Sequence, residues 1–280
     1  MQIYFNGRFM PRREATLDLE ERAANFADGV YEVVRYFNGQ PFQMQAHLDR
    51  LRDSCAAIDL PWTDAVARLD AASDELVHCN NLANATVYWQ VSRGVAPRKH
   101  AYAADMTPTV YALASPAPAL APDAQVKAVK VLTQPDTRWT ECWIKSLMLL
   151  PNVLAKTAAV RAGCDEAVFV RDGHITEGTS TSVMVVRDGV LWSHPLDGRV
   201  LPSVTLRWIK DAATRLGIPL HDAAYPLAEL PGAQEMMILG TTTLVAAVIG
   251  IDGVTVGDAS AGPITTRLHA MLRDASLRAT

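Results

Sequence analysis

Four segments of the sequence share one pattern, in which two runs rich in apolar and β-branched residues flank a two-residue turn. The turns are Asn6-Gly7, Asn38-Gly39, Asp172-Gly173 and Asp188-Gly189. Asn-Gly and Asp-Gly tolerate the positive φ angles that a tight hairpin needs, so each segment predicts two adjacent antiparallel strands. Two of these segments lie in each half of the chain. The pattern therefore predicts antiparallel strands in both halves.

Amphipathic helices are predicted between these hairpins. Apolar residues recur at helical spacing in 45–60, 63–82, 147–163, 203–217 and 264–278. Thr63 is expected to cap the second of these helices, and Pro151 to begin or bend the third. Further strands are predicted over 85–94, 108–116, 124–132 and 235–253. Helices mixed with antiparallel strands favour two α+β halves, with antiparallel-rich sheets and flanking helices.

The clearest break in composition is "SPAPALAP", which carries three of the 16 prolines. Such a stretch cannot lie inside a helix and is typical of a linker. We therefore expect an N-terminal α+β domain over residues 1–116, a linker over 117–122 and a C-terminal α+β domain over 123–280. On this division Lys145 belongs to the C-terminal domain.

The composition limits the kinds of binding partner and the cellular compartment that we expect for the protein. Hydrophobic residues make up 49% of the 280 residues, the formal net charge is −4, and no long basic run occurs, so nucleic acid is not an expected partner. No signal peptide or membrane span is predicted. The four cysteines show no CxxC spacing, so we expect reduced thiols, no metal ligand set and a cytoplasmic protein.

A single lysine, Lys145, lies in the apolar stretch "WIKSLMLL". Removal of an ammonium group from water is unfavourable unless the group is paired or loses its proton. On this stretch alone the lysine is expected to reach the surface along its methylene stem. The alternative is that it is held inside the protein for chemistry.

Polar motifs in the second half of the chain each have an ordinary and a functional interpretation. "HITEGTSTS" places Glu177 before Gly178 and four hydroxyl residues, which suits either a solvated turn or a planar polar ligand. "LPSVT" and "LGTTT" place Thr205 at a helix start and Thr241 in a turn. Both positions are typical of N-capping and turns, but they also offer backbone N–H groups to an anion such as phosphate.

Two basic motifs lie in the first half. Arg50, in "HLDRLR", either belongs to a solvated helix face or binds a phosphate through its planar guanidinium. "SRGVAPRKHAY" is either a basic surface loop or a site where Arg98 and His100 point the same way and bind a carboxylate. Together, a lysine, a carboxylate, an arginine and helix-start groups are the parts of a pyridoxal phosphate site. In such a site desolvation favours the uncharged lysine.

The sequence resembles the class IV (fold type IV) aminotransferases, and within that family the D-amino acid transaminases. The resemblance runs nearly end to end and rests on motifs in a fixed order: "YFNGRF", "FADGVYEVVRYFNGQPFQMQAHLDRL", "QVSRGVAPRKH", "RWTECWIKSLMLLPNVLAK", "ITEGTSTSV", "LPSVT" and "LGTTT". It implies a two-domain fold with pyridoxal 5′-phosphate as the cofactor.

The resemblance also implies roles for individual residues. Lys145 forms the Schiff base with the cofactor and moves the proton at the substrate α-carbon. Glu177 partners the pyridine nitrogen, which makes the ring an electron sink. Leu201 packs behind the ring and Ser180 lies near it. The groups implied to bind the phosphate are Arg50, Val204, Thr205 and Thr241.

For the substrate, the resemblance implies a carboxylate trap made of Tyr31, Arg98 and His100. In this family the last two residues reach in from the neighbouring subunit, so a homodimer with shared active sites is implied. The Arg-x-His pair marks the D-amino acid transaminases, so transamination of D-alanine-type substrates with a 2-oxo acid such as 2-oxoglutarate is expected. The alternatives are a branched-chain L-amino acid aminotransferase, an aminodeoxychorismate lyase, or a structural relative that binds pyridoxal phosphate without catalysis.

Four positions depart from the pattern of the D-amino acid transaminases. Ser182 and Met148 stand where asparagine is usual, Gly240 where serine is usual, and Leu244 where glutamate is usual. The departures leave the lysine, glutamate and arginine of the cofactor set in place. They bear on the substrate range.

Overall fold

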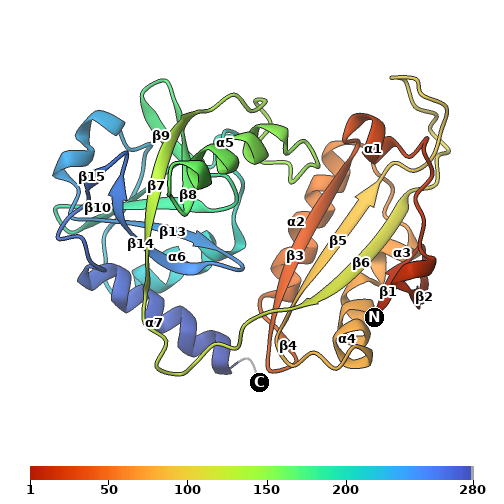
Figure 1. Ribbon diagram of the computed structural model, residues 1–280, viewed down its shortest axis with the longest axis horizontal. Coiled ribbons are helices and arrows are strands. Elements are labelled where there is room, and N and C mark those ends of the chain that lie inside the picture. Colours follow the sequence, from red (N-terminus) through yellow and green to blue (C-terminus); the bar gives the residue numbers. More distant parts are fainter. Residues whose placement is uncertain (279–280) are drawn as a thin grey trace. The chain divides into compact units, whose positions relative to one another are not determined.

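The computed structural model describes residues 1–278, and the chain forms two compact units (Figure 1). Unit 1 consists of Met1–Leu120, the short segment Ile144–Met148 and residues 276–278. Unit 2 consists of Ala121–Trp143 and Leu149–Ala275. The first crossing between the units, after Leu120, falls in the proline-rich stretch.

Unit 1 contains a six-stranded sheet in the order β2-β1-β6-β5-β3-β4, and its neighbouring strands are all antiparallel. The strands are β1 (Gln2–Phe5), β2 (Arg8–Pro11), β3 (Gly29–Phe37), β4 (Gln40–Pro41), β5 (Ala85–Ser92) and β6 (Thr109–Pro116). The β1–β2 turn has positive φ at both Asn6 and Gly7, and the β3–β4 turn at both Asn38 and Gly39. Both predicted hairpins are confirmed.

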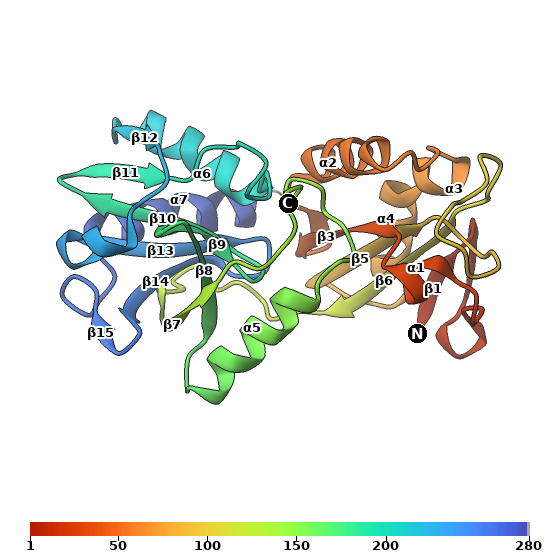
Figure 2. The same cartoon turned by 90° about the horizontal axis from the view of Figure 1, so that it is seen from above.

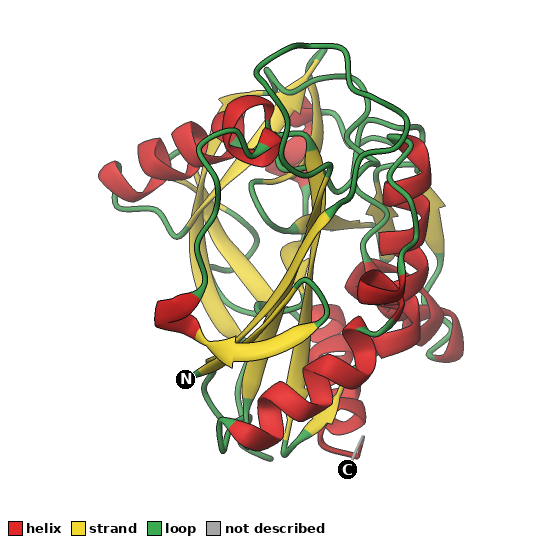
Figure 3. Ribbon diagram, turned by 90° about the vertical axis from the view of Figure 1, so that its right-hand side faces the viewer, coloured by secondary structure: helices red, strands yellow, loops and turns green. Residues whose placement is uncertain are grey.

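The helices of unit 1 are α1 (Arg22–Phe26), α2 (Met44–Ala57), α3 (Asp64–Ala67) and α4 (Leu69–Cys79), with a 3₁₀ turn over Arg12–Glu14. Figure 2 shows α2, α3 and α4 on one face of the sheet, and Figure 3 shows the helices of the chain in red and its strands in yellow. The predicted helix over 63–82 is interrupted at Arg68. Thr63 is the N-cap residue of α3, as predicted, although its side chain makes no capping hydrogen bond; its carbonyl accepts the N–H of Val66.

Unit 2 is built on a nine-stranded mixed sheet in the order β12-β11-β10-β13-β14-β7-β8-β9, with β15 beside β14. A single pair, Glu177 opposite Ser182, also links β9 to β10. The strands are β7 (Lys127–Pro135), β8 (Glu166–Arg171), β9 (His174–Gly178), β10 (Ser182–Arg187), β11 (Val190–Ser193), β12 (Leu220–Asp222), β13 (Glu235–Gly240), β14 (Leu244–Ile251) and β15 (Val254–Thr255).

Three pairings in this sheet are parallel: β7–β8, β7–β14 and β11–β12. Antiparallel pairs still predominate in this sheet, so the predicted antiparallel-rich architecture is confirmed, and the parallel pairs add a feature that the sequence pattern did not indicate. Parallel neighbours need a crossover connection, and α5 provides it between β7 and β8. The two Asp-Gly hairpins, β8–β9 and β10–β11, are confirmed.

The helices of unit 2 are α5 (Leu150–Arg161), α6 (Val204–Arg215) and α7 (Pro263–Arg278), with a 3₁₀ stretch over Leu227–Gly232. Pro151 lies in the first turn of α5, as predicted. One core cluster gathers apolar side chains of the sheet strands, among them Val131, Val185 and Ile238. No helix within residues 1–278 is long and apolar enough to cross a membrane. All four cysteines are free thiols.

Candidate active site

The segment that carries Lys145 packs within unit 1, although it lies in the second half of the sequence. The Tyr31 N–H donates to the Lys145 carbonyl at 3.0 Å, and the Leu147 N–H donates to the Gly29 carbonyl at 3.0 Å. The Lys145 N–H donates to Ser54 Oγ of α2 at 3.2 Å. The segment therefore lies beside the start of β3 as a short antiparallel bridge, and its position relative to β3 and α2 is fixed by backbone hydrogen bonds.

The Lys145 side chain is half-buried, and its Nζ lies 4.3 Å from the centre of the Tyr31 ring. Tyr31 stacks on Tyr88 with 5.7 Å between ring centres. The hydroxyls of Tyr88 and Tyr111 both donate to Gln90 Oε1, which fixes the ring behind Tyr31. The lysine amine thus lies against an aromatic ring, which attracts a cation.

Arg50 belongs to a buried cluster centred on Glu32, which is fully inaccessible. Arg50 donates to the two Glu32 oxygens at 2.6 and 2.9 Å. His47 Nδ1 lies 2.8 Å from Glu32 Oε2. Burial alone raises the pKa of the Glu32 carboxyl, but Arg50 and His47 outweigh burial and hold it well below its ordinary range. Burial lowers the pKa of His47, so the imidazole is neutral at pH 7.

Arg98 and His100 lie in the exposed loop between β5 and β6. Both approach one aromatic ring, that of Phe26: the Arg98 Cζ lies 5.2 Å from the ring centre and the His100 ring 5.5 Å. The two side chains therefore converge, as their alternation about Lys99 suggests.

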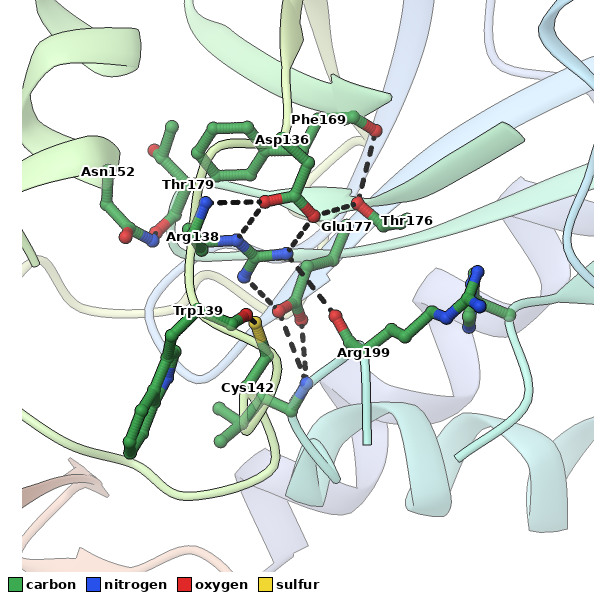
Figure 4. A network of polar contacts seen from close by, with 12 residues as sticks. Asp136, Arg138, Trp139, Cys142, Asn152, Phe169, Thr176, Glu177, Thr179 and Arg199 are labelled. Atoms are coloured by element: carbon green, nitrogen blue, oxygen red, sulfur yellow. Dashed lines mark hydrogen bonds and ion pairs between the residues drawn. The ribbon is translucent and has the colours of Figure 1, made fainter. Parts of the chain in front are cut away.

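Glu177 lies at the end of β9 in unit 2, where its side chain is 8% exposed. Figure 4 shows its carboxylate facing Arg138 and the backbone of the α6 entry. The Leu201 N–H donates to both carboxylate oxygens, at 3.2 and 3.1 Å. Arg138 also binds both oxygens of the inaccessible Asp136, at 2.9 Å each. Glu177 is therefore a buried carboxylate in a fixed orientation.

The guanidinium of Arg138 lies between the carboxylates of Asp136 and Glu177, and these opposite charges shift pKa values within the cluster. Burial raises the pKa of Asp136, but Arg138 and Arg171 outweigh burial and lower it below its ordinary value. Burial lowers the pKa of Arg138, but Asp136 and Glu177 outweigh burial and raise it. Arg138 also lies 4.5 Å over the Phe169 ring. Sequence reasoning missed Arg138 and Asp136, as it missed Glu32 in the other unit.

The helix start at "LPSVT" has the geometry that the sequence predicts. Ser203 Oγ accepts the Leu206 N–H at 3.1 Å, and α6 begins at Val204. Since the first N–H groups of a helix have no partner within it, Val204 and Thr205 lie where an anion is favoured. Thr241 lies in the β13–β14 turn, which ends at Leu244 with a φ of 58°.

The hydroxyl residues after Glu177 are organised by Glu166, which is 2% exposed. Thr179 Oγ1 and Ser180 Oγ both donate to its carboxylate. Thr181 Oγ1 is buried and has no hydrogen-bond partner within residues 1–278. A buried hydroxyl without a partner is unusual in a protein and matches a site for a polar ligand.

The four departures have different structural settings. Ser182 is buried opposite Glu177, while Met148 is 45% exposed. A Cβ at Gly240 would meet its nearest neighbour, the Ser180 carbonyl oxygen, at 3.4 Å, an ordinary contact. The packing around Gly240 therefore does not require glycine. Leu244 adopts left-handed backbone, which is uncommon for a branched apolar residue.

Comparison with known proteins identifies the family. Residues 29–251 match the family described as amino-transferase class IV. The chain is 39% identical to a D-alanine aminotransferase of Bacillus licheniformis, over 100% of this chain and 99% of the relative. It is 40% identical to a D-alanine aminotransferase of Listeria innocua, over 96% and 94%.

Solved structures agree with this match. The branched-chain amino acid aminotransferase of Escherichia coli superimposes with a TM-score of 0.87 at 26% identity, covering 95% of this chain and 91% of that one. The branched-chain aminotransferase of Thermoproteus uzoniensis gives 0.88 at 26% identity, covering 99% and 95%. The predicted fold type IV architecture is thereby confirmed, and the chain belongs to the class IV aminotransferases.

Proposed function

We propose that this aminotransferase uses pyridoxal 5′-phosphate to transaminate D-amino acids of the D-alanine type with a 2-oxo acid such as 2-oxoglutarate. The observation that carries the proposal is the full-length similarity, at 39–40% identity, to relatives named D-alanine aminotransferase. The "PRKH" loop supports it, because Arg98 and His100 converge on one ring and offer two donors to a carboxylate.

The residues fit this cofactor by charge and by hydrogen-bonding capacity. Lys145 offers an amine, Glu177 an oriented carboxylate, and the start of α6 with Val204 and Thr205 a site for an anion. The buried hydroxyl of Thr181, four residues after Glu177 in unit 2, also supports a polar ligand. Lys145 would hold the cofactor covalently, and Glu177 would pair with its pyridine nitrogen. The other residues proposed to hold it are Arg50, Ser180, Leu201 and Thr241.

When bound, the cofactor supplies the carbonyl group that accepts the substrate amino group, together with a ring that withdraws electrons from the substrate α-carbon. Lys145 Nζ removes the proton from that carbon and returns it on the acceptor. Glu177 keeps a proton on the pyridine nitrogen, and the hydrogen bond from Leu201 fixes the direction of its oxygens. Tyr31, Arg98 and His100 bind the substrate carboxylate, so only one enantiomer presents its α-hydrogen to Lys145.

The same proposal includes a homodimer with shared sites. Arg98 and His100 are exposed in the single chain, which supports a role toward a second copy. Mixing Arg98→Ala with Lys145→Ala subunits should restore activity, because one site of the heterodimer would be complete. If subunits exchange and activity stays absent, the shared site is wrong. The four free thiols support the cytoplasm as the location.

A second candidate is transamination of branched-chain L-amino acids, which the similarity to the two branched-chain enzymes favours. Initial rates with D-alanine, D-glutamate, L-alanine and L-leucine, each with 2-oxoglutarate and with pyruvate, distinguish the two. Faster turnover of L-leucine than of either D-amino acid would contradict the proposal.

The role of Lys145 is tested by Lys145→Ala, with Lys127→Ala as the control because Lys127 pairs with Asp165 on the surface. Loss of a general acid–base alone lowers rates by about 10²–10⁴-fold, and covalent attachment of the cofactor is lost as well. Lys145→Ala should therefore abolish multiple turnover while the melting temperature changes little. Turnover within about tenfold of wild type would refute the assignment.

A further inference from the structure

Arg22, the first residue of α1, is buried, and its guanidinium reaches well beyond its own helix. Its side chain is 4% exposed. Its Nε donates to Asp28 Oδ2 at 2.7 Å, while its Nη1 and Nη2 donate to the carbonyls of Lys99 and His100 at 2.6 and 3.0 Å. A single side chain thus binds two consecutive carbonyls of the "PRKH" loop.

The same helix region also holds the start of this loop, which spans residues 93–108 between β5 and β6. The Arg22 N–H donates to the Gly94 carbonyl at 3.0 Å, and the Ala96 N–H donates to the Glu20 carbonyl at 3.3 Å. The loop is therefore attached near its beginning by backbone and further along by the Arg22 side chain.

Phe26 lies one turn after Arg22 on α1, and two side chains of the loop, those of Arg98 and His100, contact its ring. The Arg22 Cζ lies 4.8 Å from its ring centre and the Arg98 Cζ 5.2 Å. The His100 ring meets it edge-on at 5.5 Å. With its carbonyl held by Arg22 and its ring against Phe26, His100 has both backbone and side-chain orientation fixed by α1.

Asp28 links this arrangement to the strand that carries Tyr31. It accepts from Arg22 and also from Arg93, at 3.0 and 2.9 Å, so one carboxylate serves two buried arginines. Arg93 also lies 3.6 Å over the Tyr102 ring of the same loop. Asp28 directly precedes β3, which contains Tyr31.

We propose that Arg22 is a positioning residue for the substrate carboxylate. It holds the loop so that Arg98 and His100 converge before any substrate arrives, and it does so from within the chain that carries the loop. Preorganised donors bind more tightly because less ordering is needed on binding. The inference rests on the proposed function for the carboxylate role, while the attachment of the loop is independent of it.

The test compares Arg22→Met with Arg22→Lys in the holoenzyme, with Arg52→Met as the control because Arg52 is an exposed arginine. Loss of hydrogen bonds from a charged group predicts a KM for D-alanine raised about tenfold or more in Arg22→Met, with kcat unchanged. Lysine keeps the positive charge but lacks the planar guanidinium with its several N–H donors. Arg22→Lys should therefore raise KM less than Arg22→Met does. The inhibition constant of propionate, which is D-alanine without its amino group, should rise in parallel with KM.

Hydrogen exchange of residues 93–108 provides a readout without turnover. Arg22→Met should speed exchange there and leave β5 and β6 protected. If Arg22→Met fails to fold, Phe26→Leu keeps the Arg22 hydrogen bonds and should still raise KM, because Arg98 and His100 lose their shared contact.

The outcomes separate the two proposals. No turnover of any D-amino acid by the wild type would overturn the proposed function. Normal wild-type turnover with an unchanged KM in the Arg22 variants, or a fall in kcat alone, would overturn the role of Arg22. A higher KM and propionate inhibition constant, together with faster loop exchange, support it.

Discussion

Two buried clusters, one in each unit, have opposite arrangements of charge. In unit 1 the carboxylate of Glu32 lies at the centre, and Arg50 and His47 surround it. In unit 2 the guanidinium of Arg138 lies at the centre, between Asp136 and Glu177. The first cluster thus presents a cation held by a carboxylate, and the second presents a carboxylate held by a cation. In each, the central group fixes the orientation of the group proposed to meet the cofactor.

The largest effect is expected from removing the centre of the first cluster. Glu32→Ala leaves the buried Arg50 without its counter-charge, and breaking a buried pair in this way destabilises by about 3–5 kcal/mol. Thermal unfolding of the cofactor-free protein measures the loss. Glu229→Ala is the control, since Glu229 pairs with Arg187 on the surface, where such pairs contribute about 0–1 kcal/mol. Equal effects of the two changes would contradict the comparison.

The second cluster is tested through the group it presents. Glu177→Gln keeps the shape but not the charge, so kcat should fall by about 10²–10³-fold, as when one preorganised electrostatic contact is lost. Cofactor affinity should fall far less, because the phosphate contacts remain. Equilibrium dialysis of the cofactor and single-turnover rates measure the two quantities. A loss of affinity as large as the loss of rate would make Glu177 a structural anchor only.

An imidazole distinguishes the first cluster from the second, and this predicts a difference in pH dependence. The pKa of His47 is lowered from its ordinary 6.5 in the folded protein. Its contribution to stability is therefore fully present above pH 6.5 and is lost as the pH falls towards the folded pKa, because the unfolded chain binds the proton first. His47→Gln should reduce the pH slope of stability below pH 6.5, by at most about 1.4 kcal/mol per pH unit.

Melting temperatures of both proteins between pH 7 and pH 5 check this. His269 also has a pKa lowered by burial, but it is present in both proteins and cancels in the difference. Identical slopes for wild type and His47→Gln would show that the imidazole does not titrate as the cluster predicts.

The smallest effect concerns the start of α6, which the second cluster adjoins through Leu201. Ser203→Ala removes the capping hydrogen bond to Leu206 and should cost about 0.5–2 kcal/mol. It should also weaken phosphate binding at Val204 and Thr205. Thr63→Ala is a matched control, because Thr63 precedes a helix without capping it through its side chain. A comparable loss of stability in Ser203→Ala and Thr63→Ala would show that the start of α6 has no special role.

The hairpins could be predicted from sequence because each is decided by two turn residues with positive φ, a local property. The parallel pairing of β7 with β14 could not, because it joins segments more than a hundred residues apart. The two clusters differ in the same way. Arg50 and Glu177 stand in motifs, whereas Glu32 and Asp136 differ from surface carboxylates only through partners that the fold brings to them.

The short segment Ile144–Met148 has a consequence for how the protein is made. It completes unit 1 by pairing with Gly29 and Tyr31, yet the chain on both sides of it belongs to unit 2. Domains generally fold as units during synthesis, starting from the N-terminus. Unit 1 cannot finish until the ribosome has released the chain past Met148, and its stretch over residues 276–278 follows Ala275 of unit 2. Unit 1 is thus begun first but completed only after part of unit 2 has been made, and the lysine reaches its final surroundings only once synthesis of the second unit has begun.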